Sequence, residues 1–261
     1  MIGIRLHRQR LTYLRDLLRE LVVREMKLRY KRSILGIAWS LLNPLVELLV
    51  LVFLFKRALR LDIPDYPSFA FTGVLAYSWF QSALYQAAGS ITDNRELIRR
   101  PGFPVAILPV VTVTTNLVHF LLAMPILLLF ILFSGKAITM AILVLPLVIA
   151  LEYLLILGIG YLVATFQVNF RDTQHLLGVV LRLLFFLTPV FYTATMIPSQ
   201  YQTLYRLNPM TQLITAYRAI LLEGAFPNPL TLLVIGLLTT GLVWFGYRVF
   251  VRASYRFVEE L

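Results

Sequence analysis

Three ionisable side chains stand inside long apolar segments of this chain, namely Glu47, Glu152 and Arg182. A charged group at the centre of a bilayer costs roughly 2.5–3.5 kcal/mol on insertion scales, so such groups usually face the protein interior or a wet cavity. Two carboxylates and one guanidinium at such positions allow two hypotheses. Either glutamate pairs with Arg182 as a structural ion pair, or the glutamates contact a substrate or couple its movement to a cation. The sequence leaves both hypotheses open.

The side chains that enzymatic chemistry requires are missing. The chain has no cysteine, and its three histidines, His7, His119 and His175, lie far apart in the sequence. No G-x-S-x-G motif, H-E-x-x-H motif or Cys/His cluster occurs. The stretch "FSGKA" lacks the first glycine and the final Ser/Thr of the phosphate-binding loop of ATPases. We therefore predict no catalytic residue, no metal site and no cofactor on this chain.

The composition predicts an integral membrane protein. Hydrophobic residues make up 59% of the 261 residues and charged residues 14%, against roughly 45–50% and about 25% in soluble domains. Ten of the 24 Lys and Arg residues fall within the first 32 positions. This distribution of the +11 net charge indicates an anionic membrane face as the partner rather than nucleic acid.

Residues 11–32 repeat apolar side chains at helical spacing, with basic side chains mostly on the remaining face. This pattern is typical of a helix that lies in the headgroup layer with its apolar stripe in the acyl chains. An ordinary solvated basic helix is the alternative. We assign residues 1–33 to a cytoplasmic, amphipathic interface helix.

Six apolar segments follow, and we predict that each crosses the bilayer as a helix. The first is too long for a signal peptide and ends in "KRALR" without a small-residue cleavage site. Its 22 residues reach about 33 Å as a helix, enough to cross the hydrocarbon core. The six segments are 34–55, 69–88, 105–133, 138–166, 176–191 and 230–251. Residues 34–261 are therefore expected to form one all-α, six-span transmembrane domain.

The distribution of basic residues predicts the orientation of these spans. Seventeen Lys and Arg residues fall in the segments on the side of the termini, and six fall in the segments on the other side. Because cytoplasmic loops carry the excess of Lys and Arg, both termini are predicted to be cytoplasmic.

The longest external segment contains "LITAYRAILLEG" at 213–224, which is amphipathic but too short to cross a bilayer. We predict that it forms a re-entrant or interfacial hairpin before the last span. Aromatic side chains are frequent in the parts of the chain that are predicted to lie towards the outer side of the membrane. An interfacial aromatic belt explains them, and stacking of aromatic faces on sugar rings is the alternative.

Two short polar segments, 90–104 and 166–178, lie between spans on the cytoplasmic side. Proline residues end the first of them before the next span. Short, stiffly anchored polar segments on one face suit contact with a cytoplasmic partner. Simple solvated turns are the competing interpretation on these features alone.

Several stretches together resemble the membrane subunit of a type-2 ABC exporter of the polysaccharide and polyol-phosphate export family, which includes O-antigen, capsule and teichoic acid permeases. They occur in the expected order over almost the whole chain. These stretches are "RYKRSILGIAWSLLNP" (29–44), "FTGVLAYSWF" (71–80), "NRELIRRPGFP" (94–104), "VNFRD" (168–172), "LNPMTQLITAYRAILLEG" (207–224) and "YRFVEEL" (255–261).

The resemblance implies a homodimer in the cytoplasmic membrane, bound to two copies of a separate ATPase subunit that holds ATP and Mg. A lipid-linked glycan would pass through the central channel of the dimer. The residues that would couple to the ATPase or gate the channel are Asn94, Arg95, Glu96, Arg99, Arg100, Arg171 and Asp172. A basic cluster would hold the interface helix at the membrane near the lipid headgroup: Arg24, Lys27, Arg29, Lys31 and Arg32. Aromatic side chains of the glycan path would be Tyr77, Trp79, Phe80, Tyr192, Tyr201 and Tyr205.

Two other functions compete with this hypothesis. A drug or small-molecule exporter permease would share the architecture but would need an occluding apolar pocket instead of a wide path. A proton- or sodium-coupled secondary transporter would work without an ATPase and would depend on Glu47 and Glu152. An intramembrane enzyme is disfavoured because its catalytic residues are absent.

Overall fold

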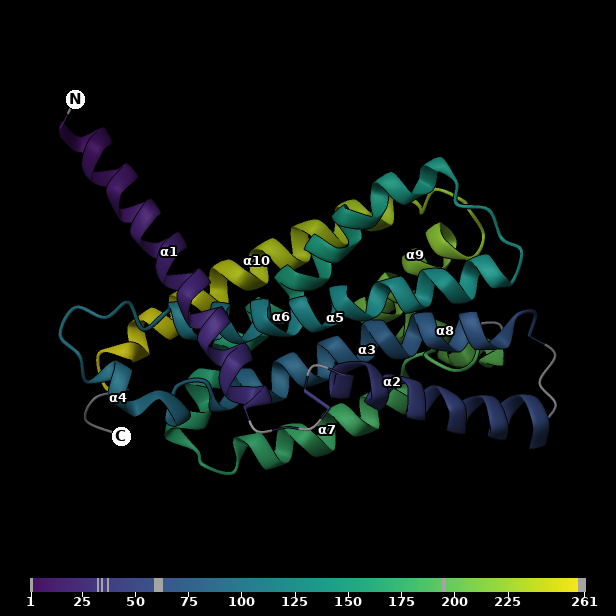
Figure 1. The fold of residues 1–261 in the computed structure, drawn as a ribbon, viewed down its shortest axis with the longest axis horizontal. Coiled ribbons are helices and arrows are strands. Elements are labelled where there is room, and N and C mark those ends of the chain that lie inside the picture. The colour runs from purple at the N-terminus through teal and green to yellow at the C-terminus, as the bar shows by residue number, and fades with distance from the viewer. Residues whose placement is uncertain are drawn as a thin grey trace.

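The computed structural model describes residues 2–31, 33, 35–36, 38–58, 63–193 and 196–257, and these ranges contain helices and no strand (Figure 1). The predicted all-α class is confirmed. The α-helices are α1 (Ile2–Tyr30), α2 (Ala38–Leu51), α3 (Tyr66–Gly89), α4 (Arg95–Ile98), α5 (Ile107–Phe133), α6 (Leu145–Asn169), α7 (Thr173–Leu187), α8 (Gln202–Leu207), α9 (Pro209–Leu221) and α10 (Pro229–Ser254). Shorter turns are the π-helix η1 (Val52–Ala58) and the 3₁₀-helices η2 (Thr92–Asn94), η3 (Met140–Val144) and η5 (Ser199–Tyr201).

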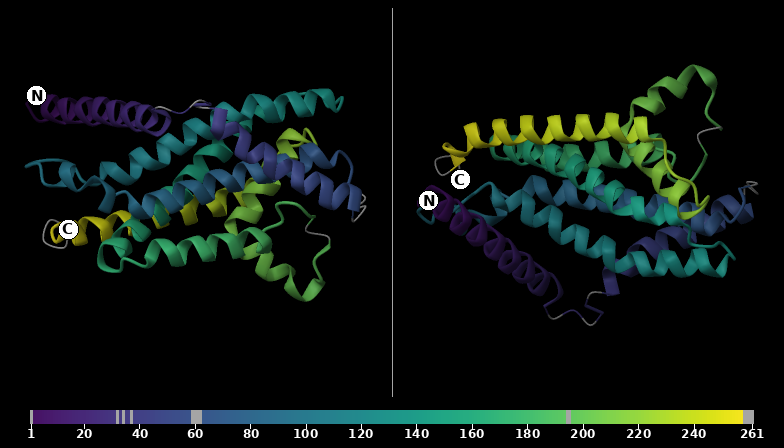
Figure 2. Two further views of the ribbon diagram at one scale, coloured as in Figure 1. Left: turned by 60° about the horizontal axis from the view of Figure 1, so that its bottom comes forward. Right: turned by 90° about the horizontal axis from the view of Figure 1, so that it is seen from above.

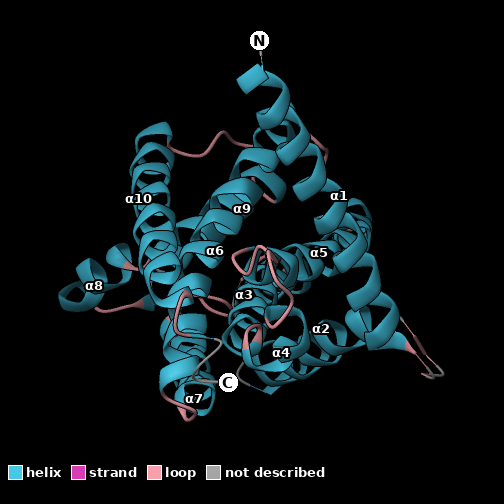
Figure 3. Cartoon of the chain, turned by 90° about the vertical axis from the view of Figure 1, so that its left-hand side faces the viewer, coloured by secondary structure: helices cyan, strands magenta, loops and turns pink. Residues whose placement is uncertain are grey.

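The long helices run back and forth along the longest axis of the molecule (Figure 1). Both chain ends and α4 lie at one end, and the connection between α5 and α6 lies at the other. Seen end-on, α3, α5 and α6 stand between α7 and α10 on one side and α1 and α2 on the other (Figure 3). Figure 2 shows α8 projecting from the side of this bundle.

Three helical segments are long and apolar enough to cross a membrane by length and composition, namely Ile107–Phe133, Met140–Asn169 and Pro229–Ser254. They coincide with the third, fourth and sixth predicted spans. The apolar helix α7 is shorter, with 15 residues. The predicted number of six spans therefore stays a prediction.

The sequence pair Asn-Pro starts two of the helices. Asn208 accepts a hydrogen bond from the backbone N–H of Met210, and Asn228 accepts hydrogen bonds from the two N–H groups that follow Pro229. Asparagine at the N-cap accepts hydrogen bonds from N–H groups that have no partner within the helix. Proline has no N–H group, but in the first turn this costs no intrahelical hydrogen bond. These local signals explain why α9 and α10 begin where they do.

Close helix contact at two glycines joins α6 to α10. A Cβ atom on Gly246 would lie 2.4 Å from the carbonyl oxygen of Gly158, and a Cβ on Gly158 would lie 2.9 Å from the backbone of Leu242. Small residues allow helix backbones to approach one another, which is how helices associate where the hydrophobic effect gives no net drive. These two glycines therefore allow α10 to pack closely against α6.

Helix α7 is held partly through its backbone. Leu181 is its one buried residue among those described, and the Leu181 carbonyl accepts a 2.6 Å hydrogen bond from the hydroxyl of Tyr77 on α3. Beyond the helix, the carbonyl of Phe191 accepts a 3.0 Å hydrogen bond from Tyr66. Both tyrosines are fully buried. Side chains of α7 add contacts to α3, since the ring of Phe185 meets that of Tyr77 with centroids 5.3 Å apart and Gln174 donates to the Tyr85 carbonyl.

Within the residues 1–33 assigned to the interface helix, α1 runs from Ile2 to Tyr30 and so also covers residues before position 11, where the amphipathic pattern starts. It packs against α5 and ends at Tyr30, so the predicted division at residue 33 falls between α1 and α2. Arg32 lies outside the described residues. The first predicted span corresponds to α2 with its π-helical continuation η1.

Candidate functional site

One face of α3 carries polar side chains that line two neighbouring cavities. The central cavity, about 530 Å³, is bounded by α2, α3, α5 and the end of α1. The lateral cavity, about 450 Å³, lies between α3 and α7. Gln81, Ser82 and Gln86 line both cavities, so the polar face is continuous from one to the other. Most of the remaining surface of α3 is buried.

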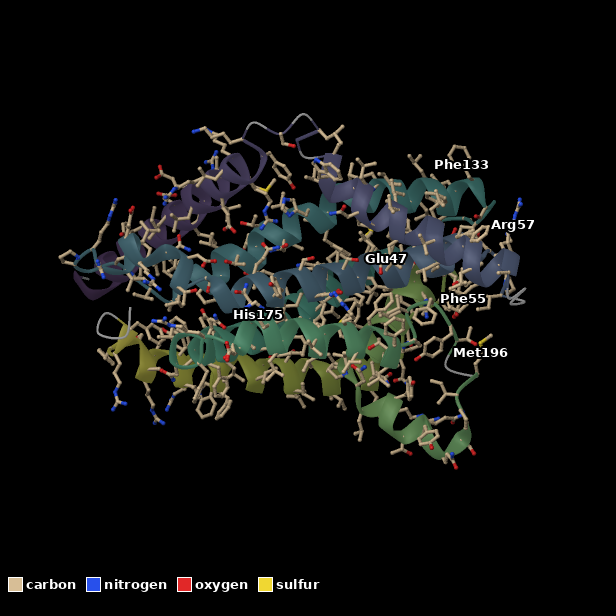
Figure 4. All side chains as sticks on the ribbon, turned by 90° about the horizontal axis from the view of Figure 1, so that it is seen from below. Glu47, Phe55, Arg57, Phe133, His175 and Met196 are labelled. Atoms are coloured by element: carbon tan, nitrogen blue, oxygen red, sulfur yellow. The ribbon has the colours of Figure 1, made fainter. Side chains whose placement is uncertain are left out.

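The central cavity combines a carboxylate with amides and an indole. Glu47 reaches it from α2, at about mid-length of the bundle (Figure 4). Trp79 forms part of the wall, stacks on Phe120 with ring centroids 4.8 Å apart, and is 3% exposed. Its buried Nε1–H has no hydrogen-bond partner among the described residues. Polar acceptors and donors beside an aromatic wall suit a ligand with many hydroxyl groups.

A third cavity, of about 290 Å³, lies at the junction of α1 with α3 and α5. We call it the cytoplasmic cavity after the predicted orientation of the chain. Arg29 and Gln86 line this cavity and the central cavity as well. The Arg29 guanidinium donates to Gln86 Oε1 and lies 3.3 Å from His119 Nδ1. The hydroxyl of Tyr30 lies 2.9 Å from His119 Nε2, and Asn116 Nδ2 donates to Gln86 Oε1 at 3.1 Å. We call these five residues the junction cluster.

The structure separates the three ionisable groups that we singled out first. Glu152 is fully buried and accepts a 2.7 Å hydrogen bond from the hydroxyl of Tyr217 on α9. Arg182 lines the lateral cavity from α7, whereas Glu47 lines the central cavity. Among the described residues, neither glutamate forms an ion pair with Arg182. The ion-pair hypothesis is therefore wrong for this conformation.

The two predicted coupling segments lie together at the end of the molecule that holds the chain termini. In the first segment, Leu97 and Ile98 are buried and anchor α4 to the core. The side chains that remain exposed around them are Arg95, Glu96, Arg99 and Arg100, while Asn94 is half-buried and donates to the Ser90 carbonyl. In the second segment, Arg171 and Asp172 are exposed. Gln174 of this segment donates to the Tyr85 carbonyl at 3.1 Å, which ties the second segment to α3.

The basic cluster of α1 divides between two faces of the helix. Arg29 belongs to the junction cluster, whereas Lys27 and Lys31 line a shallow groove on the outer face of α1. Arg24 lines both the cytoplasmic cavity and this groove. Burial raises the pKa of Glu25, although its neighbour Arg29 and a hydrogen bond from Thr115 act in the opposite direction.

The predicted glycan-path aromatics fall into two groups. Tyr77 and Phe80 are buried within the protomer, so a sugar cannot stack on them in this conformation, and Trp79 borders the central cavity. Tyr192, Tyr201 and Tyr205 lie after α7, near α8. Tyr192 donates a 3.1 Å hydrogen bond to Tyr205, and Tyr201 is 52% exposed.

Arg218 is a structural residue that our sequence reasoning missed, because we counted it among the external charges. It is 7% exposed and donates to the carbonyls of Pro189 at 2.8 Å and Val190 at 2.6 Å, and to that of Phe69 at 3.3 Å. Its guanidinium also lies 3.5 Å from the centroid of the Phe69 ring. One signal was available, since Arg218 occupies a position of the apolar stripe of α9, one turn from Ile214.

Comparison with known proteins identifies the family of the chain. The family model for ABC-2 type transporters matches residues 16–222. The chain therefore belongs to the ABC-2 type transporter family.

Its relatives include the O-antigen export system permease protein RfbA of Myxococcus xanthus, which is 36% identical over 99% of this chain and 100% of the relative. RfbA of Klebsiella pneumoniae is 29% identical over 96% of this chain and 97% of the relative. The polysialic acid transport protein KpsM of Escherichia coli is 26% identical over 92% of each chain. The resemblance deduced from the sequence is confirmed at the level of the family.

Proposed function

We propose that this chain is the membrane-spanning subunit of an ATP-driven exporter that moves a lipid-linked polysaccharide across the cytoplasmic membrane. The observation that carries the proposal is the near full-length similarity to O-antigen export permeases. The polar cavities along α3 support it, because a hydroxyl-rich polymer needs a continuous polar surface within the bilayer. A drug exporter of the same family would instead need an enclosed apolar pocket.

The partner of the polar face is proposed to be a second copy of the chain. The face opens between α2 and α7, whose outer surfaces carry exposed apolar side chains. Polar surface that faces lipid is costly. A dimer that apposed these faces would cover them and enclose a wet path. In this arrangement, residues 34–261 cross the membrane six times and residues 1–33 lie on the cytoplasmic surface.

The coupling segments are proposed to contact a cytoplasmic ATPase subunit, present in two copies, on which ATP and Mg are bound. Buried Leu97 and Ile98 support this role, because they pack against the core and so fix the position of the exposed charged side chains of α4. The same end of the molecule carries both chain termini (Figure 1). Its excess of basic residues supports a cytoplasmic position.

The basic cluster on α1 is proposed to hold the helix at anionic lipid and to attract the charged headgroup of the substrate. The segment from α8 to α9 is proposed to form the external hairpin that closes the outer end of the path. Its three tyrosines would offer stacking surfaces to sugar rings.

The test is purification of the tagged chain from its native host in mild detergent, combined with deletion of its gene. We expect a stoichiometric ATP-binding subunit, vanadate-sensitive ATP hydrolysis, and loss of a surface polysaccharide from the deletion strain. An inactive homo-oligomer together with unchanged surface polysaccharide would contradict the proposal. Loss of drug resistance without any change in polysaccharide would favour the drug exporter.

The orientation can be tested by cysteine labelling. The chain contains no cysteine, so a thiol reagent reacts only with the single cysteine that is introduced. A cysteine at Lys136, in the connection between α5 and α6, should react with an impermeable maleimide on intact cells. A cysteine at Glu96 should react only after the membrane is permeabilised. The reverse pattern would invert the proposed topology.

A further inference from the structure

We propose that Glu47 of each protomer forms an ion pair with Arg182 of the partner subunit. The inference rests on the dimer of the proposed function and deepens it, because it names the two residues that meet when the polar faces are apposed. It also gives each of these charges the partner that one protomer does not supply.

Two opposite charges stand without a partner within apolar helices. Glu47 is half-buried on α2, and Arg182 is exposed on α7. Among the described residues, neither side chain forms a hydrogen bond or an ion pair. The other basic groups that line the central cavity, Arg29 and His119, contact one another instead. An unpaired charge within a membrane span is costly, so both groups require a partner from outside the protomer.

The two charges lie beside the same stretch of α3. The central cavity, which Glu47 lines, and the lateral cavity, which Arg182 lines, share Gln81 and Ser82 of α3. Helices α2 and α7 stand on opposite sides of α3 when the bundle is seen end-on (Figure 3). The carboxylate and the guanidinium therefore occupy the two rims of the polar face, at about the same level of the bundle.

The symmetry of a dimer brings these rims together. Two copies with the same orientation in a membrane are related by a twofold axis along the membrane normal, and rotation about this axis leaves the depth of every residue unchanged. When the polar face of each copy is turned towards the axis, α2 of one protomer faces α7 of the other. Glu47 then meets the partner's Arg182, and Arg182 meets the partner's Glu47. An axis beside α2 would instead bring two glutamates together, which like-charge repulsion disfavours.

Apolar side chains surround both charges on the outer surfaces of their helices. The exposed ones nearest in sequence are Val46, Leu49 and Val50 on α2, and Val179, Leu183 and Phe186 on α7. Lipid would cover these residues as well as a second protein chain would, so the charges and not the apolar area select the partner. Packing of the apolar residues in a dimer would exclude water from the ion pair, and a lower dielectric constant strengthens its Coulomb attraction.

The ion pairs have a consequence for the path that the dimer encloses. With both pairs formed, Glu47 and Arg182 add no net charge to the middle of the path. An unpaired charge there would bind and retain a polymer of opposite charge, whereas passage through a membrane path requires that binding stay weak. The pairs would also join α2 to α7 of the partner subunit on both sides of the path.

The first test is cross-linking in membranes of the native host that contain the complete transporter. Two versions of the chain with different tags are produced together, one with Glu47→Cys and the other with Arg182→Cys. The reagent is a short bifunctional maleimide, because two long side chains in an ion pair hold their Cα atoms farther apart than the roughly 4.4–6.8 Å of a disulfide. We expect a cross-linked product that carries both tags. The matched control combines Val46→Cys with Leu183→Cys, exposed neighbours that point about 100° away on the same helices, and should give severalfold less product.

The two tags separate failure of the inference from failure of the proposed function. If the tags co-purify but Glu47→Cys and Arg182→Cys give no more product than the control pair, the inference fails while the proposed dimer stands. A product between two Glu47→Cys chains would also overturn the inference, because α2 would then face α2. Tags that purify separately would refute the proposed dimer and the inference together.

A charge exchange tests the same ion pair without a reagent. Glu47→Arg alone would set two arginines against one another, and we expect subunits to exchange between differently labelled transporters in micelles about tenfold faster or more. Adding Arg182→Glu to the same chain restores the pair with its charges exchanged, so exchange should return to within about threefold of the wild-type rate. Such recovery distinguishes an ion pair from a general loss of folding. A double variant that exchanges as fast as Glu47→Arg would overturn the proposal.

Discussion

Arg218 gives the sharpest test of how α9 is held to the segment that follows α7. We consider Arg218→Met, because methionine keeps much of the buried stem but removes the guanidinium. The two short hydrogen bonds to the carbonyls of Pro189 and Val190 are lost, and both oxygens are left without this partner. The cation–π contact with Phe69 is lost as well. The variant should therefore loosen α9 from the segment that follows α7.

The expected change in the free energy of unfolding is the balance of lost contacts and a removed desolvation penalty. Hydrogen bonds to charged groups contribute about 1.5–3 kcal/mol each, so the two short ones contribute about 3–6 kcal/mol. The cation–π contact adds about 2 kcal/mol when desolvated. Removing a buried cation also removes a desolvation penalty of several kcal/mol. We expect a net loss of about 2–4 kcal/mol in the free energy of unfolding for Arg218→Met.

The assay is equilibrium unfolding in mixed micelles, followed by tryptophan fluorescence. Arg218→Lys keeps the charge without the planar fork and should be intermediate, because a single ammonium cannot match the guanidinium geometry. An Arg218→Met variant at least as stable as the wild type would refute the reasoning. It would mean that desolvation of the buried guanidinium outweighs all its contacts.

Two further predictions concern helix packing and coupling. Gly246→Leu should lower the free energy of unfolding by about 1–3 kcal/mol through overpacking, since even its Cβ would lie 2.4 Å from a backbone oxygen of α6. Gly241→Leu, on the same helix with open space around its Cβ, should be nearly neutral in the same assay. Reversing the charges of Arg99 and Arg100 should reduce ATPase co-purification and stimulated hydrolysis at least severalfold while leaving membrane insertion intact. Reversal at exposed Arg206 of α8 is the control, and equal effects at the two sites would argue against the proposed contact.

Local signals in the sequence predicted the elements well. The apolar runs that became α5, α6 and α10 were long enough to identify. The Asn-Pro pairs before α9 and α10 are local signals of the same kind, although we did not use them. These features depend on residues close together in the chain. They are therefore visible without knowledge of the tertiary structure.

Contacts between helices were not predictable in the same way. Glu152 bonds to Tyr217 rather than to Arg182, because its partner depends on which helices are neighbours and how each is rotated about its axis. The junction cluster joins α1, α3 and α5, and no periodicity within one helix reveals such a meeting. The second coupling segment was found as a polar stretch, but its hydrogen bond to α3 is accepted by the backbone carbonyl of Tyr85, which carries no sequence signature.

The way in which α7 is attached has a consequence for evolution. Four backbone oxygens, those of Leu181, Pro189, Val190 and Phe191, accept hydrogen bonds that help to hold α7 and the segment after it. Every amino acid offers the same oxygen, so substitutions along the exposed surface of α7 leave these bonds intact. This surface can therefore diverge between species while the scaffold beneath it persists. If the substrate changes during evolution, substitutions on this surface of α7 can accumulate without disrupting the fold.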